Sequence, residues 1–244
     1  MRYVLSIVLV FLFTGAARAD ERPLLIRVFV ALCDNENQGI VPVKSSLGKG
    51  DDLKGNLYWG ALYGVKTFFN KSDHWSLKSC VKKPFGGKNG VLERCIFEDQ
   101  GYRAKLVADA YRGAEIENAV ADFLKAAHEP GGADMIVYVG HNGLMDFPTP
   151  KVSPAANKMK KPRAIILACK SREYFAPLLK KSAARPLLMT TGFMAPEAYT
   201  LDAALWTWLA GNNDLQVRQA AAEAYARYQK IDLPAAQRLF AGGM

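Results

Sequence analysis

Apolar and polar positions alternate along this chain in two distinct ways. Short apolar runs, rich in β-branched side chains, predict buried strands, and stretches with apolar residues every three or four positions predict amphipathic helices. The predicted strands are residues 24–32, 104–111, 135–140, 164–168 and 186–191. The predicted helices are residues 53–69, 115–128, 172–181, 199–209 and 215–230.

Regular alternation of apolar strands with helices indicates an α/β fold. Such strands are buried on both faces, so we expect a three-layer sandwich in which helices cover a mostly parallel sheet. The sequence has no internal repeat, low-complexity tract or linker that would divide it. We therefore expect one domain over residues 20–244, with residues 72–101, which contain short strand-like pieces, as an excursion from the core.

The first nineteen residues have a different pattern. Arg2 precedes an apolar run over residues 4–13, and Ala17-Arg18-Ala19 forms a small-x-small cleavage site before Asp20. A run of about ten residues is too short to span a membrane and is typical of a signal peptide. The pattern predicts a signal peptide over 1–19, a periplasmic or secreted mature protein, and no membrane attachment after cleavage.

Composition adds little to this picture. Half of the residues are hydrophobic, which excludes a disordered chain, and the formal net charge is +9. Basic clusters can bind nucleic acid, but this one has no interleaved aromatic residues and no recognised module, so we expect no nucleic-acid partner. The cluster consists of Lys151, Lys158, Lys160, Lys161 and Arg163.

The four cysteines predict one disulfide. Cys80 and Cys95 flank a glycine-rich turn over residues 84–90, and an exported protein folds under oxidising conditions. A bond between them would close a loop of about fifteen residues and stabilise the fold by about 3 kcal/mol. Cys33 and Cys169 are left as either free thiols or a second disulfide.

Polar or reactive residues follow three of the predicted strands. Cys33-Asp34-Asn35 follows the first, His141-Asn142-Gly143 follows residues 135–140, and Cys169 follows residues 164–168. Ligands of open α/β sheets bind beyond the carboxyl ends of the strands. If the last two strands are neighbours, His141 and Cys169 lie about 5 Å apart laterally.

A histidine beside a cysteine favours the thiolate, which is the nucleophilic form. In this interpretation Cys169 attacks a carbonyl carbon and His141 orients or protonates the leaving group. The backbone amides of Gly143 and Cys169 would form an oxyanion hole.

The two strand ends resemble the caspase–legumain–gingipain superfamily of cysteine peptidases, in which one apolar strand ends in His-Gly and the next in a small residue and the catalytic cysteine. The matching residues are His141 after 135–140, and Ala168 and Cys169 after 164–168. The resemblance implies a caspase-like fold, a peptide or protein substrate, a catalytic Cys169–His141 dyad and no cofactor. It also implies that the end of the first strand, with Asp34 and Asn35, helps to orient the histidine or bind substrate; an acidic pocket at Asp34 would favour a basic residue.

Three features depart from the family pattern, and one is the separation of His141 and Cys169 by 28 residues (169 − 141), shorter than the ~50 of caspases. Asn142 stands between His141 and Gly143, which bears on the oxyanion hole, and Lys170-Ser171 follows the cysteine. The alternative hypothesis is a non-catalytic exported binding protein on the same fold, for which a buried or disulfide-bonded Cys169 would be evidence. The three histidines are widely separated and no His-Glu-x-x-His motif is present, so we expect no metal site. Nothing in the sequence assigns an oligomeric state.

Overall fold

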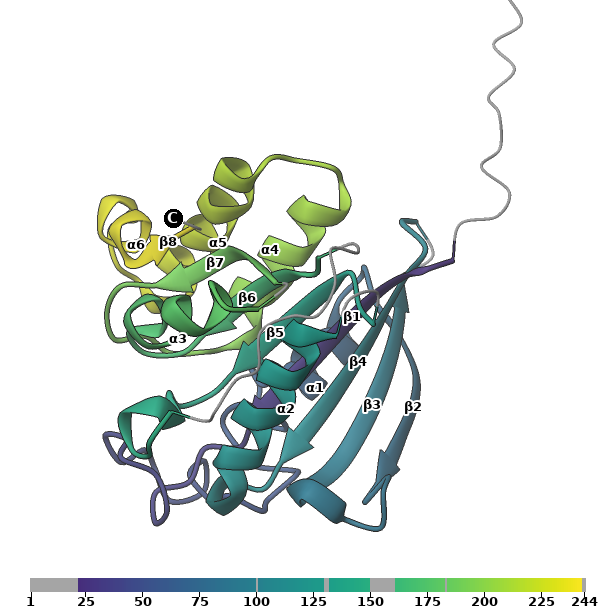
Figure 1. Ribbon diagram of the computed structural model, residues 1–244, viewed down its shortest axis with the longest axis vertical. Helices are drawn as coiled ribbons and strands as arrows, with labels where there is room; N and C mark the ends of the chain where they lie inside the picture. The colour runs from purple at the N-terminus through teal and green to yellow at the C-terminus, as the bar shows by residue number, and fades with distance from the viewer. Residues whose placement is uncertain (1–21, 100, 130–131, 150–160, 183, 243–244) are drawn as a thin grey trace, which may run out of the picture.

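The computed structural model describes residues 22–99, 101–129, 132–149, 161–182 and 184–242 (Figure 1). The predicted signal peptide therefore lies outside the described residues. The strands are β1 (Leu24–Ala31), β2 (Ser76–Lys82), β3 (Val91–Asp99), β4 (Ala104–Tyr111), β5 (Met135–Val139), β6 (Arg163–Leu167), β7 (Arg185–Thr190) and β8 (Phe240–Ala241). The helices are α1 (Val65–Lys71), α2 (Ile116–His128), α3 (Ser171–Leu179), α4 (Ala198–Leu209), α5 (Asp214–Gln229) and α6 (Leu233–Leu239).

All of these strands belong to one sheet, in the order β2-β3-β4-β1-β5-β6-β7-β8. The central strands β4, β1, β5, β6 and β7 run parallel, whereas β3 and β8 pair antiparallel with β4 and β7. The order reverses at β1, because the chain builds the β4 side first and then crosses to β5. The predicted α/β class with a mostly parallel sheet is confirmed.

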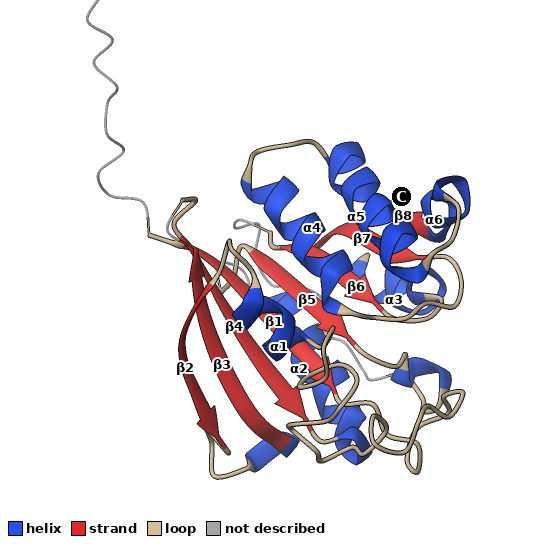
Figure 2. Ribbon diagram, turned by 180° about the vertical axis from the view of Figure 1, so that it is seen from behind, coloured by secondary structure: helices blue, strands red, loops and turns tan. Residues whose placement is uncertain are grey.

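Helices cover both faces of the sheet (Figures 1 and 2). Phe29 points to one face, where it packs against Phe123 of α2, and Phe175 of α3 lies in the same cluster. Its neighbours Val28 and Val30 point to the opposite face, which α1, α4 and α5 cover. This alternation follows from the two-residue period of a strand and produces three layers.

The predicted strands agree with the observed ones to within one or two residues, but the helix over 53–69 is wrong. Only Val65–Lys71 is helical, and turns occupy residues 53–64. The fully buried side chain of Asn56 accepts a hydrogen bond from the Cys33 amide and donates to the Cys33 and Lys49 carbonyls, which ties the segment to the end of β1. A Cβ on Gly64 would lie 2.5 Å from the Trp59 backbone, so only glycine allows this compact turn.

Residues 76–99, within the segment expected as an excursion, extend the sheet. β2 and β3 form a hairpin that pairs onto β4, and Phe97 of β3 is fully buried in the core. Cys80 lies opposite Cys95 in this hairpin, and the predicted disulfide between them is present.

Candidate active site

The loop that carries His141 is held in place by its backbone. Gly140 has a φ of 145°, and a Cβ at this position would lie 2.7 Å from the Ala31 carbonyl oxygen, so glycine lets β5 end close against β1. The buried hydroxyl of Tyr138 donates to the His141 carbonyl at 2.8 Å. These contacts fix the position of the His141 backbone, from which the imidazole projects.

The imidazole of His141 is paired with a carboxylate. Its Nε2 lies 2.7 Å from Oδ2 of Asp146, and the His141 side chain is only 5% exposed. The same carboxylate oxygen accepts the Gly39 amide at 3.0 Å, which joins the loop after β1 to the loop after β5. Sequence reasoning missed Asp146; the available signal was a carboxylate five residues after the histidine, which the 3-10 turn Gly143–Met145 brings back to the ring.

Asn142 connects the histidine loop to the cysteine loop. Its side chain is fully buried, with Nδ2 donating to the Cys169 carbonyl at 2.8 Å and Oδ1 accepting the Leu144 amide at 3.2 Å. Gly143, predicted as an oxyanion donor, donates its amide to the His141 carbonyl at 3.1 Å. In this structure both residues build the turn.

Cys169 lies at the end of the neighbouring strand. β5 and β6 are parallel with Val139 opposite Leu167, so His141 and Cys169 stand two residues beyond a paired position on adjacent strands. Cys169 is a free, partly exposed thiol whose Sγ lies 3.4 Å from the amide nitrogen of Met194 and 3.6 Å from its carbonyl oxygen. Between the imidazole and this thiol, both in the described part of the chain, there is no hydrogen bond.

A buried hydroxyl network supports the turn after Cys169. Ser171 Oγ donates to the Ile166 carbonyl at 2.9 Å and accepts the Thr190 amide at 2.8 Å. The Thr190 hydroxyl donates in turn to the Ala168 carbonyl. This network holds the ends of β6 and β7 together, and neither Ser171 nor Thr190 stood out in the sequence.

Cys33 has a different environment from Cys169. It is fully buried and free, and burial raises the pKa of its thiol to about 11 despite a hydrogen bond with Tyr58. Cys33 therefore stays protonated at neutral pH. Since both remaining cysteines are free, the structure contains no Cys33–Cys169 disulfide.

Asp34 and Asn35 line a separate cavity of about 360 Å³ at the same end of the sheet. The carboxylate of Asp34 accepts the Glu36 and Asn37 amides and Nδ2 of Asn37, and Asn35 pairs with the backbone of Val43. These hydrogen bonds shape the loop itself. The loop reaches His141 through Gly39 and Asp146 instead.

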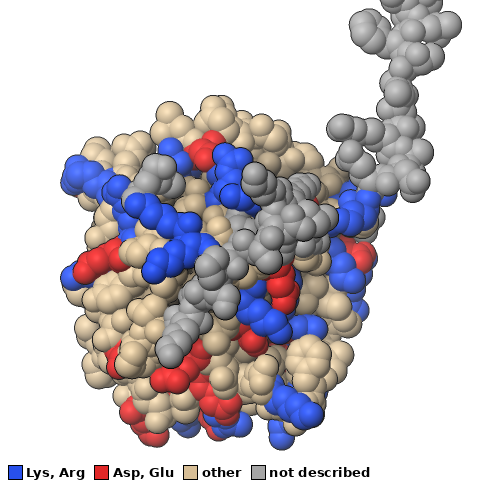
Figure 3. Space-filling view, in the orientation of Figure 1, with Lys and Arg blue, Asp and Glu red and all other residues tan. Residues whose placement is uncertain are grey.

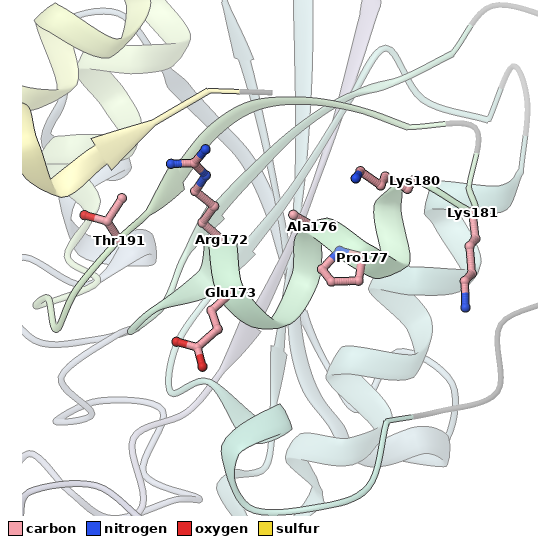
Figure 4. A pocket seen from close by; sticks show the side chains of 7 residues that line it. All are labelled: Arg172, Glu173, Ala176, Pro177, Lys180, Lys181 and Thr191. Atoms are coloured by element: carbon pink, nitrogen blue, oxygen red, sulfur yellow. The ribbon is translucent and has the colours of Figure 1, made fainter. Parts of the chain in front are cut away.

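A cavity of about 600 Å³ lies along the outer face of α3 (Figure 4). Arg172 projects from this helix, Lys180 and Lys181 follow its C-terminal end, and basic side chains gather on the same face of the molecule in Figure 3. Of the predicted basic cluster, Lys151, Lys158 and Lys160 lie outside the described residues. Arg163 pairs with Asp214 at 2.6 Å, so it contributes to the fold.

Comparisons with protein-family models, with curated proteins and with solved structures found no match. Within the residues that the structure describes, no helix has the length and apolar character needed to cross a membrane. The support for the candidate site is therefore the geometry described above. It lies one strand from the β1–β5 switch point, at the edge of the sheet where open α/β folds bind ligands.

Proposed function

We propose that this protein is an exported cysteine peptidase-like hydrolase in which Cys169 is the nucleophile, His141 the acid and base, and Asp146 the group that orients His141. The observation that carries this proposal is the histidine–carboxylate pair next to a free, partly exposed cysteine on the adjacent strand. A nucleophile, a base and a third group that orients the base form the arrangement used in covalent hydrolysis.

Asp146 determines which imidazole nitrogen can act as the acid and base. Its bond to Nε2 holds a proton on that nitrogen and leaves Nδ1, which has no hydrogen bond to any described residue, to exchange a proton with the thiol. The carboxylate also stabilises the imidazolium that forms. Asp146 is thus a positioning residue.

The reaction proceeds in two balanced steps. The Cys169 sulfur forms a bond to the scissile carbonyl carbon, the C–N bond breaks, and His141 passes a proton to the leaving amine. Water then attacks the thioester, His141 takes a proton from that water, and Cys169 is released with the new carboxylic acid. Because the Gly143 amide is engaged with the His141 carbonyl, the Cys169 amide is the oxyanion donor in this scheme.

The proposal that the protein is exported rests on the predicted signal peptide and on the Cys80–Cys95 disulfide. Disulfides persist in oxidising compartments and are rare in the cytosol. The disulfide is far along the sheet from Cys169, since β2 and β6 are separated by β3, β4, β1 and β5.

Iodoacetamide labelling of the non-reduced protein between pH 5 and 9, followed by peptide mass spectrometry, tests the proposal. We expect Cys169 to react at pH 6 about tenfold faster than an ordinary thiol, because a larger thiolate fraction outweighs its lower intrinsic nucleophilicity. His141→Ala should abolish that advantage and Asp146→Asn should reduce it. His128→Ala, whose imidazole bonds the Leu124 carbonyl in α2, should change nothing.

Cys33 serves as an internal reference in the same experiment. Its buried thiol should stay unlabelled until the protein unfolds. If Cys169 labels no faster than an ordinary thiol, or labels equally in the His141→Ala variant, the hydrolase proposal fails. A non-catalytic binding protein on the same fold is then the better hypothesis.

A further inference from the structure

Large apolar side chains are exposed around the candidate site. Leu62 is 57% exposed, Met145 36% and Phe193 70%. They belong to the loops that follow β1, β5 and β7, all at the carboxyl end of the sheet. We call these three side chains the apolar rim; exposed apolar groups gathered beside a polar site are typical of a binding surface.

Each rim residue is next to a group that contacts the site or its loops. Phe193 precedes Met194, whose backbone holds the Cys169 sulfur, and Met145 precedes Asp146, which pairs with His141. Leu62 precedes Tyr63, whose carbonyl accepts the Ala198 amide just beyond the Phe193 loop. Phe193 and Met145 are therefore on the two loops that contact Cys169, and Leu62 is on a segment bonded to the start of α4.

The charges nearby argue against a basic substrate side chain. Asp146 is engaged with His141 and Gly39, and the Asp34 carboxylate is satisfied within its own loop. A cation lies beside the Phe193 ring: Nζ of Lys170 is 5.3 Å from its centroid. A lysine or arginine of a substrate would meet this cation, whereas an apolar side chain would cover the exposed ring.

We infer that the site accepts peptides with a large apolar residue, aromatic or leucine, at the scissile carbonyl, and that Phe193 provides the main contact. This inference rests on the proposed function, since it assigns substrate chemistry to the same cysteine. Transfer of such a side chain from water onto an apolar surface is the driving force, and apolar contact of this kind discriminates between substrates by about tenfold or more.

Peptidyl chloromethyl ketones with Phe, Leu, Lys or Asp next to the reactive ketone test the inference. The Cys169 sulfur displaces chloride from the methylene carbon, so a stable thioether and a chloride ion form, and mass spectrometry measures the rate. Iodoacetamide, which carries no side chain, reports the reactivity of the thiol alone. We expect the Phe and Leu probes to alkylate Cys169 at least tenfold faster than the Lys probe. An Asp probe that reacts faster than the Phe and Leu probes would mean that Lys170, rather than Phe193, selects the substrate, and would overturn the inference.

Phe193→Ala should slow the Phe probe about tenfold and leave the iodoacetamide rate unchanged. Leu215→Ala is the matched control: Leu215 is 66% exposed, but it lies in the first turn of α5 beside Asp214, which binds Arg163 at the opposite end of β6 from Cys169. Equal rates for all four probes, or no effect of Phe193→Ala, would overturn the inference. If Cys169 still reacts rapidly with iodoacetamide in that case, the proposed function stands. If Cys169 does not react with iodoacetamide either, both this inference and the proposed function fail.

Discussion

Replacing Asn142 with alanine tests whether this buried amide holds the two loops of the site together. The substitution removes a donor to the Cys169 carbonyl and an acceptor for the Leu144 amide, and the Asn142 side chain is fully buried. A buried group that loses its hydrogen-bond partner costs about 1–3 kcal/mol. Cys169 is partly exposed, so its carbonyl regains some hydration, and we expect a total loss of about 2–4 kcal/mol.

Urea unfolding monitored by circular dichroism and tryptophan fluorescence measures this loss as a lower midpoint at unchanged slope. Asn142→Asp should destabilise at least as strongly, because it keeps an acceptor for Leu144 but places a carboxylate oxygen against the Cys169 carbonyl. Asn212→Ala is the matched control, since the Asn212 amide bonds the Thr207 carbonyl at an exposed position. It should change the free energy of unfolding by no more than about 0.5 kcal/mol.

A loss below about 0.5 kcal/mol for Asn142→Ala would refute the reasoning, because that is the size of an ordinary surface substitution. It would mean that the loops after β5 and β6 are held by their strands alone.

Two further predictions concern stability. The double substitution Cys80→Ser and Cys95→Ser should lower the free energy of unfolding by about 3 kcal/mol in urea denaturation, because it releases a loop of fifteen residues. It should leave the labelling rate of Cys169 unchanged. A faster or slower rate would show that the hairpin shapes the site. Burial raises the pKa of Glu197, so its contribution to stability is present at low pH and is lost as the pH rises through that raised pKa. Glu197→Gln should therefore increase the melting temperature relative to the unchanged protein more at pH 8 than at pH 4, and an equal difference at both pH values would contradict this assignment.

The sequence determined most of the fold because its signals are local. The strand β5 is a continuous apolar run and β1, β4, β6 and β7 are mostly apolar, and such runs have few alternatives to a buried parallel sheet. The disulfide was also predictable, because Cys80 and Cys95 flank a short turn-forming segment. The prediction of a helix over 53–69 was wrong because helical spacing is a weak signal, and the buried side chain of Asn56 is bonded to the backbone of Cys33, 23 residues away in the sequence.

The candidate site divides in the same way. Strand ends are readable from the sequence, so His141 and Cys169 could be placed at the carboxyl edge. Whether their strands are neighbours was left open by the sequence, and the structure pairs β5 with β6. Their partners required the tertiary structure: Asp146 reaches His141 through a 3-10 turn, Met194 reaches Cys169 from the loop after β7, and Asn142 joins the two loops. Hydrogen-bond partners depend on where loops pack against one another, and no periodicity along the chain encodes that packing.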